Sequence, residues 1–582
     1  FVRGFPGGGD APFLTIALEN SPIYPAPTLS FLENSQLFRI DDTIEMVEGL
    51  RGGPNPVVSN GQPGLTTNFR LKRGGESTEA SAKYTISDYG LNRIDVVASG
   101  ALDDDLYYMV GGYIKSSEGI RDAGFNSEQG NQFTVNITKV FEKGELNLYT
   151  RQTDDRGTWY LPTPLNVEGI DANYTQIGPL NRQGTITYGP NDTTESFDFG
   201  EGRGWDGHVS GGSIKLDLGN DWQLVDRFNL TKGKANTFGL VPNGSATTVA
   251  SVADNGESAT GAVTGTVYDG DTPIQQIGRW VVLKDIEAFT NDLAVSKSWE
   301  DFDTSFGIYS ASTKANDWWS IGNTAYHVLQ PGGELLDGIE CNTDAQGCDW
   351  NYDISSVGDA STFPLYATGT WYATTDLSID LGLRRENHEV NYSVDEDLDG
   401  KITKALEYDE TKTSWTVGAN YALNDTSGVF VRMNRGYKMP YFDDFRDNWG
   451  AYTGGNDLIK EVTQGELGYK FMNDSIQFFA TAFANEVKGD TFVRRPGAPA
   501  EILTNEAYGI ELDGRYSHDS GFSLSVNGTI QETEITASAN NEGNESQRQP
   551  GWQVRVTPSY GFDIGDMYAT VYGTLSAVDD RF

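Results

Sequence analysis

Apolar and polar side chains alternate with a period of two along much of this chain. From Phe133 to Thr138, for example, apolar residues alternate with Thr and Asn. The same alternation recurs in the segments 213–218, 292–299, 377–384, 414–423, 522–531, 552–562 and 567–575. Because successive side chains of a β-strand point to opposite faces, the pattern predicts strands with one apolar and one polar face.

Two kinds of protein contain such strands. A soluble antiparallel sheet buries its apolar face, whereas a transmembrane β-barrel turns that face to lipid and the polar face to a wet lumen. The predicted strands are ~9–12 residues long, as a tilted bilayer crossing requires. Tight turns such as 142–144 alternate with long acidic loops, and aromatic residues lie near strand ends, at Trp299, Tyr421, Trp552 and Phe562. We therefore predict an all-β fold, a transmembrane antiparallel β-barrel, with a soluble β-rich protein as the alternative.

The long predicted loops are rich in aromatic residues. These loops are 152–207, 235–278, 316–363, 391–411, 438–460 and 533–550. They carry Trp159, Tyr160, Trp205, Trp318, Trp319, Trp350, Tyr441 and Trp449. Such residues can belong to an interfacial girdle or pack within the loops. They can also form stacking surfaces for a sugar or an aromatic ligand at the mouth of the barrel.

Composition narrows the possible functions. The chain has 83 acidic and 42 basic side chains, a formal net charge of −41, which argues against a nucleic-acid binder. The four histidines are scattered, and no nucleophile elbow or zinc-binding His pair accompanies them, so we expect no enzyme. An acidic mouth would also attract cations and repel anionic chelates.

The first 75 residues do not alternate, and they resemble a known family. The run Phe38 to Pro54, with Ile44-Glu45-Met46-Val47-Glu48 near its centre, and the stretch Asn60 to Leu71 are similar to the plug domain of TonB-dependent outer-membrane receptors. Phe1 to Phe5 resembles the Ile-Arg-Gly-Phe strand that lies earlier in that plug. The chain departs from the family at Met46, where Arg is usual, and at Gly49, where Val is usual.

The resemblance continues through the rest of the chain. Arg435 to Phe445 is similar to the family's Gly-Phe-Lys-x-Pro-x-x-x-Asp/Glu-Leu segment, and Leu458 to Lys470 to its Pro-Glu…Glu-Leu-Gly-x-Lys strand. Ala480 to Phe483 and Gly509 to Leu512 fit the strands that follow. Each motif alone is weakly specific, but their common order and spacing cover nearly the whole chain.

The resemblance implies a 22-stranded barrel whose lumen holds an N-terminal α+β plug, whereas period-two counting delineates only about 18–20 strands. We expect a partial plug over 1–75 and the barrel, with long extracellular loops, over 76–582. The early plug with its TonB box, and two C-terminal strands, are expected to lie outside this sequence. The family places such a protein in the Gram-negative outer membrane, with lipid around the barrel and TonB as its energising partner. Glu48 and Arg51 would take part in the plug–barrel charge network.

Two loop features have competing interpretations. Asp395, Asp397 and Asp399, with Gly400, follow the spacing of the first half of a calcium loop, but a solvated acidic hairpin tip explains them equally. Apart from calcium here, no cofactor is expected. Cys341 and Cys348 lie seven residues apart in a Gly/Asp/Asn-rich loop, where a disulfide would pin the loop tip. Free thiols and a metal site are the alternatives.

The function predicted is active import of a scarce nutrient. The tryptophan-rich loops favour an oligosaccharide or another neutral organic nutrient, with a ferric siderophore as the alternative. A passive porin or structural barrel is the alternative from another class, and an ordered plug argues against it. At the plug apex we expect contacts to the substrate from Phe13, Tyr24, Asn55, Asn60 and Gln62.

Overall fold

A computed structural model describes residues 3–5, 13–25, 29–32, 34–165, 167–253, 257–337, 339, 351–492 and 500–581. The chain is 67% strand and 4% helix, so the prediction of an all-β fold is confirmed. Among the described residues, no helix has the length and apolarity that a membrane crossing requires.

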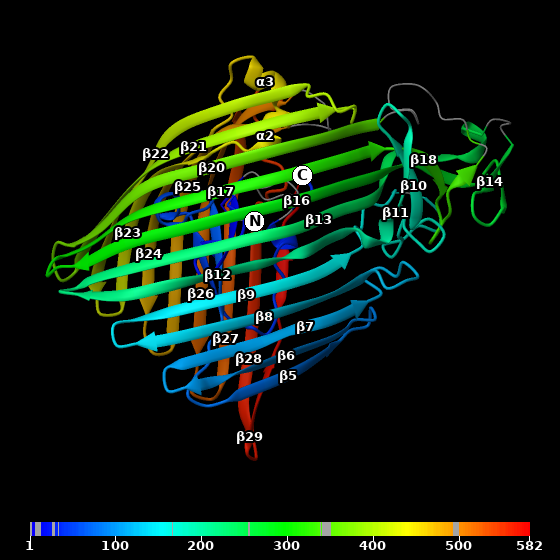
Figure 1. Cartoon of the computed structure of the whole chain (residues 1–582). Helices are drawn as coiled ribbons and strands as arrows, with labels where there is room; N and C mark the ends of the chain where they lie inside the picture. The colour runs from blue at the N-terminus through cyan, green and yellow to red at the C-terminus, as the bar shows by residue number, and fades with distance from the viewer. Residues whose placement is uncertain are drawn as a thin grey trace.

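A small mixed sheet forms the plug. Its strands, in the order β2-β1-β4-β3, are β1 (Leu14–Leu18), β2 (Ser21–Pro22), β3 (Ile44–Arg51) and β4 (Leu65–Leu71). Strand β1 runs parallel to β4, whereas β3 runs antiparallel to it. The 3-10 turn η1 (Asn34–Gln36) precedes β3, and the short helix α1 (Asn55–Val58) lies in the loop between β3 and β4. In Figure 1 these dark blue elements lie within the ring of barrel strands.

The remaining long strands form a closed antiparallel barrel around the plug. The wall consists of β5 (Glu79–Ile86), β6 (Asn92–Asp103), β7 (Leu106–Ser117), β8 (Glu128–Phe141), β9 (Gly144–Gly157), β12 (Arg203–Gly219), β13 (Trp222–Thr248), β16 (Pro273–Ser298), β17 (Phe302–Gly322), β20 (Asn351–Tyr372), β21 (Leu377–Glu396), β22 (Lys404–Asn424), β23 (Ser427–Lys438), β24 (Lys460–Met472), β25 (Ile476–Phe492), β26 (Glu501–Ser517), β27 (Phe522–Ala537), β28 (Trp552–Ile564), β29 (Met567–Tyr572) and β30 (Leu575–Val578). With β18 counted as a continuation of β17, and with β29 and β30, which both pair with β28, counted as one strand, the described residues provide 19 wall strands. This number lies within the range from period-two counting and below the 22 that the family resemblance implies.

The strands are far longer than the sequence pattern predicts. Strand β13 has 27 residues, β16 has 26 and β20 has 22, against a predicted ~9–12. Much of the predicted loops 235–278, 316–363 and 391–411 is therefore strand. The residues on the outer face of the wall explain why the sequence pattern underestimates the length of the strands. Near the tight turns this face is apolar and exposed, as at Phe306 and Leu381, but further along the same strands it carries exposed charges such as Lys314 and Glu389.

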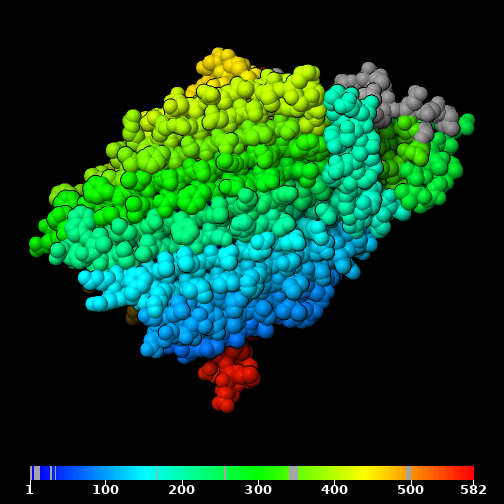
Figure 2. All heavy atoms as spheres, in the orientation of Figure 1, coloured from blue at the N-terminus to red at the C-terminus, as the bar shows by residue number. Residues whose placement is uncertain are grey.

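Smaller elements lie beyond the wall at the end opposite the tight turns. One is the hairpin of β10 (Gln183–Tyr188) and β11 (Thr193–Asp198). Another, here called the outer lobe, is the three-stranded sheet of β14 (Ser258–Gly261), β15 (Val267–Asp269) and β19 (Leu336–Asp337). Figures 1 and 2 show the hairpin and the outer lobe projecting from this rim. The remaining short elements are η2 (Phe199–Glu201), η3 (Val249–Ser251), β18 (Ala325–Val328), α2 (Phe442–Asp447) and α3 (Trp449–Thr453).

The largest apolar core joins three parts of the molecule. Leu18, Leu29 and Phe69 of the plug pack in one cluster with residues of the wall and with Phe442 and Phe445 of α2. Because the plug and α2 share this core, burial of apolar surface holds both inside the barrel. This arrangement positions the two cavities described next.

Candidate ligand cavities

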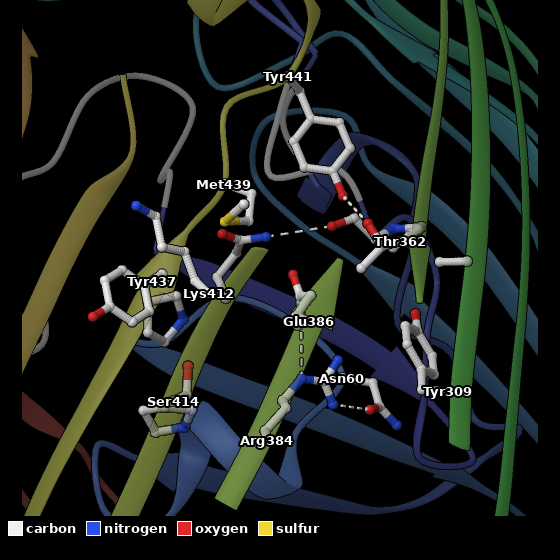
Figure 3. Close-up of a pocket in the computed structure, with 16 residues that line it drawn as sticks. Asn60, Tyr309, Thr362, Arg384, Glu386, Lys412, Ser414, Tyr437, Met439 and Tyr441 are labelled. Atoms are coloured by element: carbon white, nitrogen blue, oxygen red, sulfur yellow. Dashed lines mark hydrogen bonds and ion pairs between the residues drawn. The ribbon is translucent and has the colours of Figure 1, made fainter. Parts of the chain in front are cut away.

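A small cavity lies where the loop between β3 and β4 of the plug meets the wall. Its free volume of about 40 Å³ is enough for a few water molecules. We call it the inner chamber, and Figure 3 shows it in close-up. Its lining comprises Pro25, Pro56, Asn60, Gly61, Gln62, Pro63, Tyr309, Ala311, Thr362, Arg384, Glu386, Lys412, Ser414, Tyr437, Met439 and Tyr441.

Arg384 of β21 links the wall to the plug inside this chamber. Its Nη1 donates a hydrogen bond to Oδ1 of Asn60 over 2.7 Å, and its Nε donates to Glu386 over 3.0 Å. The guanidinium also lies 5.4 Å from the ring centroid of Tyr309, whose buried hydroxyl has no hydrogen-bond partner among the described residues. With Lys412, which pairs with Asp457 over 3.5 Å, the lining holds two cations and one carboxylate, and Arg384 can donate hydrogen bonds to an anionic or strongly polar ligand.

The predicted plug residues have different roles. Asn60 and Gln62 line the chamber, as expected for residues near the plug apex. Asn55 instead stabilises the loop: its Nδ2 donates to the carbonyl of Gln62 over 3.0 Å. Phe13 is buried against Phe5, at a ring distance of 5.3 Å. The Tyr24 ring is buried too, in the core shared with α2, and neither Phe13 nor Tyr24 lines the chamber.

A second, larger cavity opens at the loop end of the barrel. Its free volume is about 1030 Å³, at the upper end of the range for ligand sites. It is lined by Tyr352, Glu396, Lys404, Arg446, Asp447, Asn448, Trp449, Gly450, Ala451, Asn456, Phe492, Ala500, Glu501, Ile502, Ala539 and Asn540. We call this cavity the vestibule.

Most of the predicted aromatic residues pack inside the protein. Trp205 and Trp319 are each 2% exposed and belong to the large core. Trp159 lies beside Phe31 and Arg203, and Trp318 contacts the ring of Tyr188. These four side chains do not form the open stacking surface that the sequence suggests. The same holds for Tyr160, whose hydroxyl donates to the carbonyl of Arg121.

Two of the predicted aromatic residues line the inner chamber or the vestibule, whereas Trp159 and Tyr160 line only a void of about 10 Å³. Trp449 lines the vestibule, and Tyr441 lines the inner chamber. Trp350 lies outside the described residues, as do Cys341 and Cys348, so their predicted roles stay predictions.

Ion pairs fix the plug to the wall. Arg51 pairs with Asp513 over 2.6 Å and with Glu511 over 3.4 Å, in agreement with its predicted place in a plug–barrel network. The observed contacts of Glu48 differ from the prediction. It pairs with Arg70 over 2.9 Å within the plug, because it lies opposite Asn68 on the β3–β4 ladder and faces its own sheet. Arg70 and Asn68 each donate a hydrogen bond to Glu48, and these two bonds lower the pKa of Glu48.

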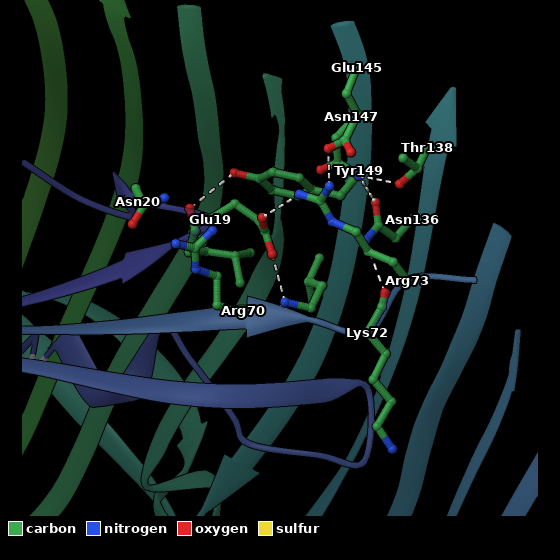
Figure 4. A network of polar contacts seen from close by, with 12 residues as sticks. Glu19, Asn20, Arg70, Lys72, Arg73, Asn136, Thr138, Glu145, Asn147 and Tyr149 are labelled. Carbon is green, nitrogen blue, oxygen red and sulfur yellow. Dashed lines mark hydrogen bonds and ion pairs between the residues drawn. The ribbon is translucent and has the colours of Figure 1, made fainter. Parts of the chain in front are cut away.

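The sequence analysis missed several of these contacts. Arg3 pairs with Glu466 over 2.7 Å and with Glu511 over 2.9 Å, and all three side chains are buried. Arg73 bridges Glu19 of the plug and Glu145 of β9, and Figure 4 shows this network. Arg3 lies in the stretch Phe1 to Phe5 that resembles a plug motif, but its partners lie more than 460 residues away.

The acidic hairpin tip between β21 and β22 binds its own backbone. Asp395 accepts hydrogen bonds from the N–H groups of Asp399 and Gly400, over 3.2 and 2.9 Å. Asp399 pairs with Lys401, and Asp397 has a φ of 71° at the turn. In the described part of the chain, no three His, Cys, Asp or Glu side chains form a metal-ligand group. Calcium at this tip stays a prediction, which calcium-dependent thermal stability would test.

Comparison with known proteins defines the family of the chain. Residues 65–581 match the family described as "TonB dependent receptor-like, beta-barrel". The chain belongs to the TonB-dependent receptor family. Members of this family are receptors and transporters, not enzymes, and they lie in the Gram-negative outer membrane, as the sequence resemblance implies. The lipid-facing part of the wall is therefore the apolar half of each long strand.

Individual relatives are distant. The pesticin receptor of Yersinia pestis is 24% identical over 235 residues, which cover 38% of this chain and about a third, 33%, of that receptor. The solved structure of the ferric yersiniabactin uptake receptor FyuA from Yersinia pestis has a TM-score of 0.69 at 15% identity, over 99% of this chain and 79% of that one. BauA, the ferric preacinetobactin receptor from Acinetobacter baumannii, has a TM-score of 0.66 at 14% identity, over 100% and 79%. At such identities the structures show a common fold.

Proposed function

We propose that this receptor imports a ferric chelate of a small organic ligand, with energy transmitted by TonB to the plug. The names of FyuA and BauA state ferric cargo, so the comparisons favour the siderophore alternative over the oligosaccharide that the sequence analysis preferred. The packed positions of Trp159, Trp205, Trp318 and Trp319 weaken the argument for a sugar-stacking mouth. An ordered plug bound to the wall also argues against a passive pore.

The observation that carries the proposal is the contact of Arg384 with Asn60 in the inner chamber. A guanidinium forms charge-assisted hydrogen bonds with the anionic oxygens that chelate iron. Although the chain as a whole has a charge of −41, the chamber has an excess of positive side chains in Arg384 and Lys412 over Glu386. Because the free volume of the chamber is only about 40 Å³, such cargo must widen the chamber to replace Asn60 at Arg384, and it would then contact the plug and the wall together.

The first test is the abundance of the protein in its native outer membrane. We expect induction under iron starvation, because receptors for ferric chelates serve iron-poor growth. Induction by a polysaccharide carbon source at replete iron, and none by iron starvation, would overturn the proposal in favour of a carbohydrate.

The second test is binding to the purified receptor. The probes are ferric complexes of hydroxamate, catecholate and citrate type, with maltooligosaccharides for comparison, and the readout is quenching of tryptophan fluorescence. For the chelate that binds, Arg384→Gln should raise Kd about tenfold or more, since a hydrogen bond to a charged group contributes ~1.5–3 kcal/mol. Lys401→Gln, at the exposed hairpin tip, is the matched control and should leave Kd unchanged. An unchanged Kd in Arg384→Gln would remove the chamber from the binding site.

A further inference from the structure

Helix α2 and the residues around it separate the two cavities. Met439 and Tyr441, just before α2, line the inner chamber. Arg446 and Asp447, at the end of α2, line the vestibule together with Trp449. The segment therefore presents one side to each cavity, and we call 439–449 the partition. Cargo that passes from the vestibule to the plug must pass it.

One buried arginine binds the partition to the wall, in addition to the apolar packing of Phe442 and Phe445 and a hydrogen bond between His388 and the carbonyl of Pro440 over 2.8 Å. Arg446 contacts Asp317 of β17 over 3.2 Å, and its guanidinium lies 3.9 Å from the ring centroid of Trp319 on the same strand. It also contacts Asp443 over 3.1 Å and Asp447 over 2.8 Å within α2. Burial acts to lower the pKa of Arg446, but the carboxylates of Asp443 and Asp447 together act more strongly in the opposite direction. The pKa of Arg446 is therefore raised, and the side chain stays charged.

The same cluster reaches the plug. The backbone N–H of Ser30 donates to Asp443, and its hydroxyl donates to Asp447 over 3.3 Å. Nη2 of Arg446 donates to the Ser30 hydroxyl over 3.2 Å. Three carboxylates, of Asp317, Asp443 and Asp447, thus share Arg446, and Lys284 at 2.6 Å from Asp317 is a second cation at the wall.

We propose that Arg446 is the positioning residue that keeps the partition closed and bound to the plug. An isolated helix of six residues is not stable in water, so α2 depends on its contacts with the wall and the plug. Without the guanidinium, the three carboxylates repel one another, and α2 loses its ion pair with Asp317 and one of its hydrogen bonds to Ser30. The partition then leaves the wall, and the inner chamber opens to the vestibule. Displacement of α2 would also release Ser30 of the plug. In this way, a change in the vestibule would reach the plug.

The test measures access to the chamber without any cargo. In a background with Cys341→Ser and Cys348→Ser, Ser414→Cys places a thiol in the inner chamber and Ala539→Cys places one in the vestibule. Intact cells are treated with a maleimide too large to cross porins, so that it approaches only from outside. Labelling at position 539 reports the vestibule, and labelling at 414 reports passage of the partition.

We expect slow labelling at 414 when Arg446 is present. Arg446→Gln should raise this rate about tenfold or more, because removing one partner of a buried ion cluster is strongly destabilising. Arg446→Lys should restore part of the slow labelling. Labelling at 539 should not change. The matched control is Arg435→Gln, which removes an arginine that pairs with Glu461 on the wall.

Two outcomes would overturn the proposal. One is equal labelling at 414 with and without Arg446, since the partition would then be no barrier. The other is a parallel rise at 414 and 539, which would mean general loosening of the mouth. The inference rests on the proposed function in one respect only, namely that cargo moves from the vestibule toward the plug. Because the test uses no chelate, its failure is distinct from a failure to bind one.

Discussion

At the scale of single residues, buried arginines hold the plug and α2 in place. Arg3 holds the plug to the wall, and Arg446 holds α2 to the wall and the plug. Sequence analysis identified Arg51, because the plug motif includes it, but not Arg3 or Arg446. An isolated arginine carries no sequence signal for a carboxylate on a distant strand: Arg3 and Glu511 are 508 positions apart. Only the closed barrel brings such pairs together.

Arg3 gives a prediction about how firmly the plug is anchored. Arg3→Gln leaves Glu466 buried without an ion pair and Glu511 with only its longer pair to Arg51, which should destabilise plug docking by about 3–5 kcal/mol. The measurement is amide hydrogen exchange over 13–25, which should become faster. Arg70→Gln, which breaks a half-exposed pair within the plug, is the matched control and should change exchange by a factor below about five, since exposed pairs contribute ~0–1 kcal/mol. Equal exchange in the two variants would contradict an anchoring role for Arg3.

At the scale of elements, the sequence predicted the half of each strand that faces lipid. The segments 377–384 and 414–423 alternate because lipid covers one face and the lumen the other. Beyond them, β21 and β22 carry polar residues on the outer face, such as Glu389 and Asp409, while inward residues such as Val390 are buried in the core. The apolar side of the strand therefore changes from the outer to the inner face, and those stretches were interpreted as loops. Backbone pairing with the neighbouring strand keeps them extended.

The outer lobe gives a prediction about pH. Glu334 accepts hydrogen bonds from the N–H groups of Val263 and Thr264, over 2.9 and 2.8 Å, and from the hydroxyl of Tyr268 over 3.0 Å. Burial acts to raise the pKa of Glu334, but these hydrogen bonds and that of the Thr264 hydroxyl lower it below its ordinary value of 4.5. A lowered pKa stabilises the folded lobe above pH 4.5, and the stabilisation is lost as the pH falls through the folded value.

Hydrogen exchange over 258–269, corrected for intrinsic rates, should therefore become faster between pH 6 and pH 3. Glu334→Gln should remove most of this pH dependence, since the amide does not titrate. Glu195→Gln on the β10–β11 hairpin, where Glu195 is exposed, is the matched control and should leave it intact. An unaltered pH profile in Glu334→Gln would show that another group controls the lobe.

At the scale of the whole molecule, the family resemblance in the sequence identified the receptor, but not its cargo. Several short motifs, each weakly specific, occur along the chain in the order of the family. This order was sufficient to predict a plug followed by a barrel. The cargo preference rested on tryptophans whose positions depend on tertiary packing: Trp205 and Trp319 are buried, and Trp159 and Trp318 are half-buried against neighbouring side chains. Net charge did not report on the inner chamber, because −41 describes the whole chain, whereas the side chains that line the chamber include two cations and one carboxylate.

The division of each strand into a lipid-facing half and a solvated half gives the last prediction. Leu381 and Asn391 lie on the same outward face of β21, ten residues apart, with Leu381 in the apolar part and Asn391 in the polar part. Leu381→Arg should reduce the free energy of unfolding in lipid vesicles by about 2–4 kcal/mol, since a charge at the bilayer midplane loses its hydration. Asn391→Arg, the same change on the same face, should alter it by less than about 1 kcal/mol, because water surrounds that part of the strand. Denaturant titration of tryptophan fluorescence measures both variants. Similar losses would mean that the membrane covers the strand as far as Asn391, and losses in reverse order would place the lipid at the opposite end of the barrel.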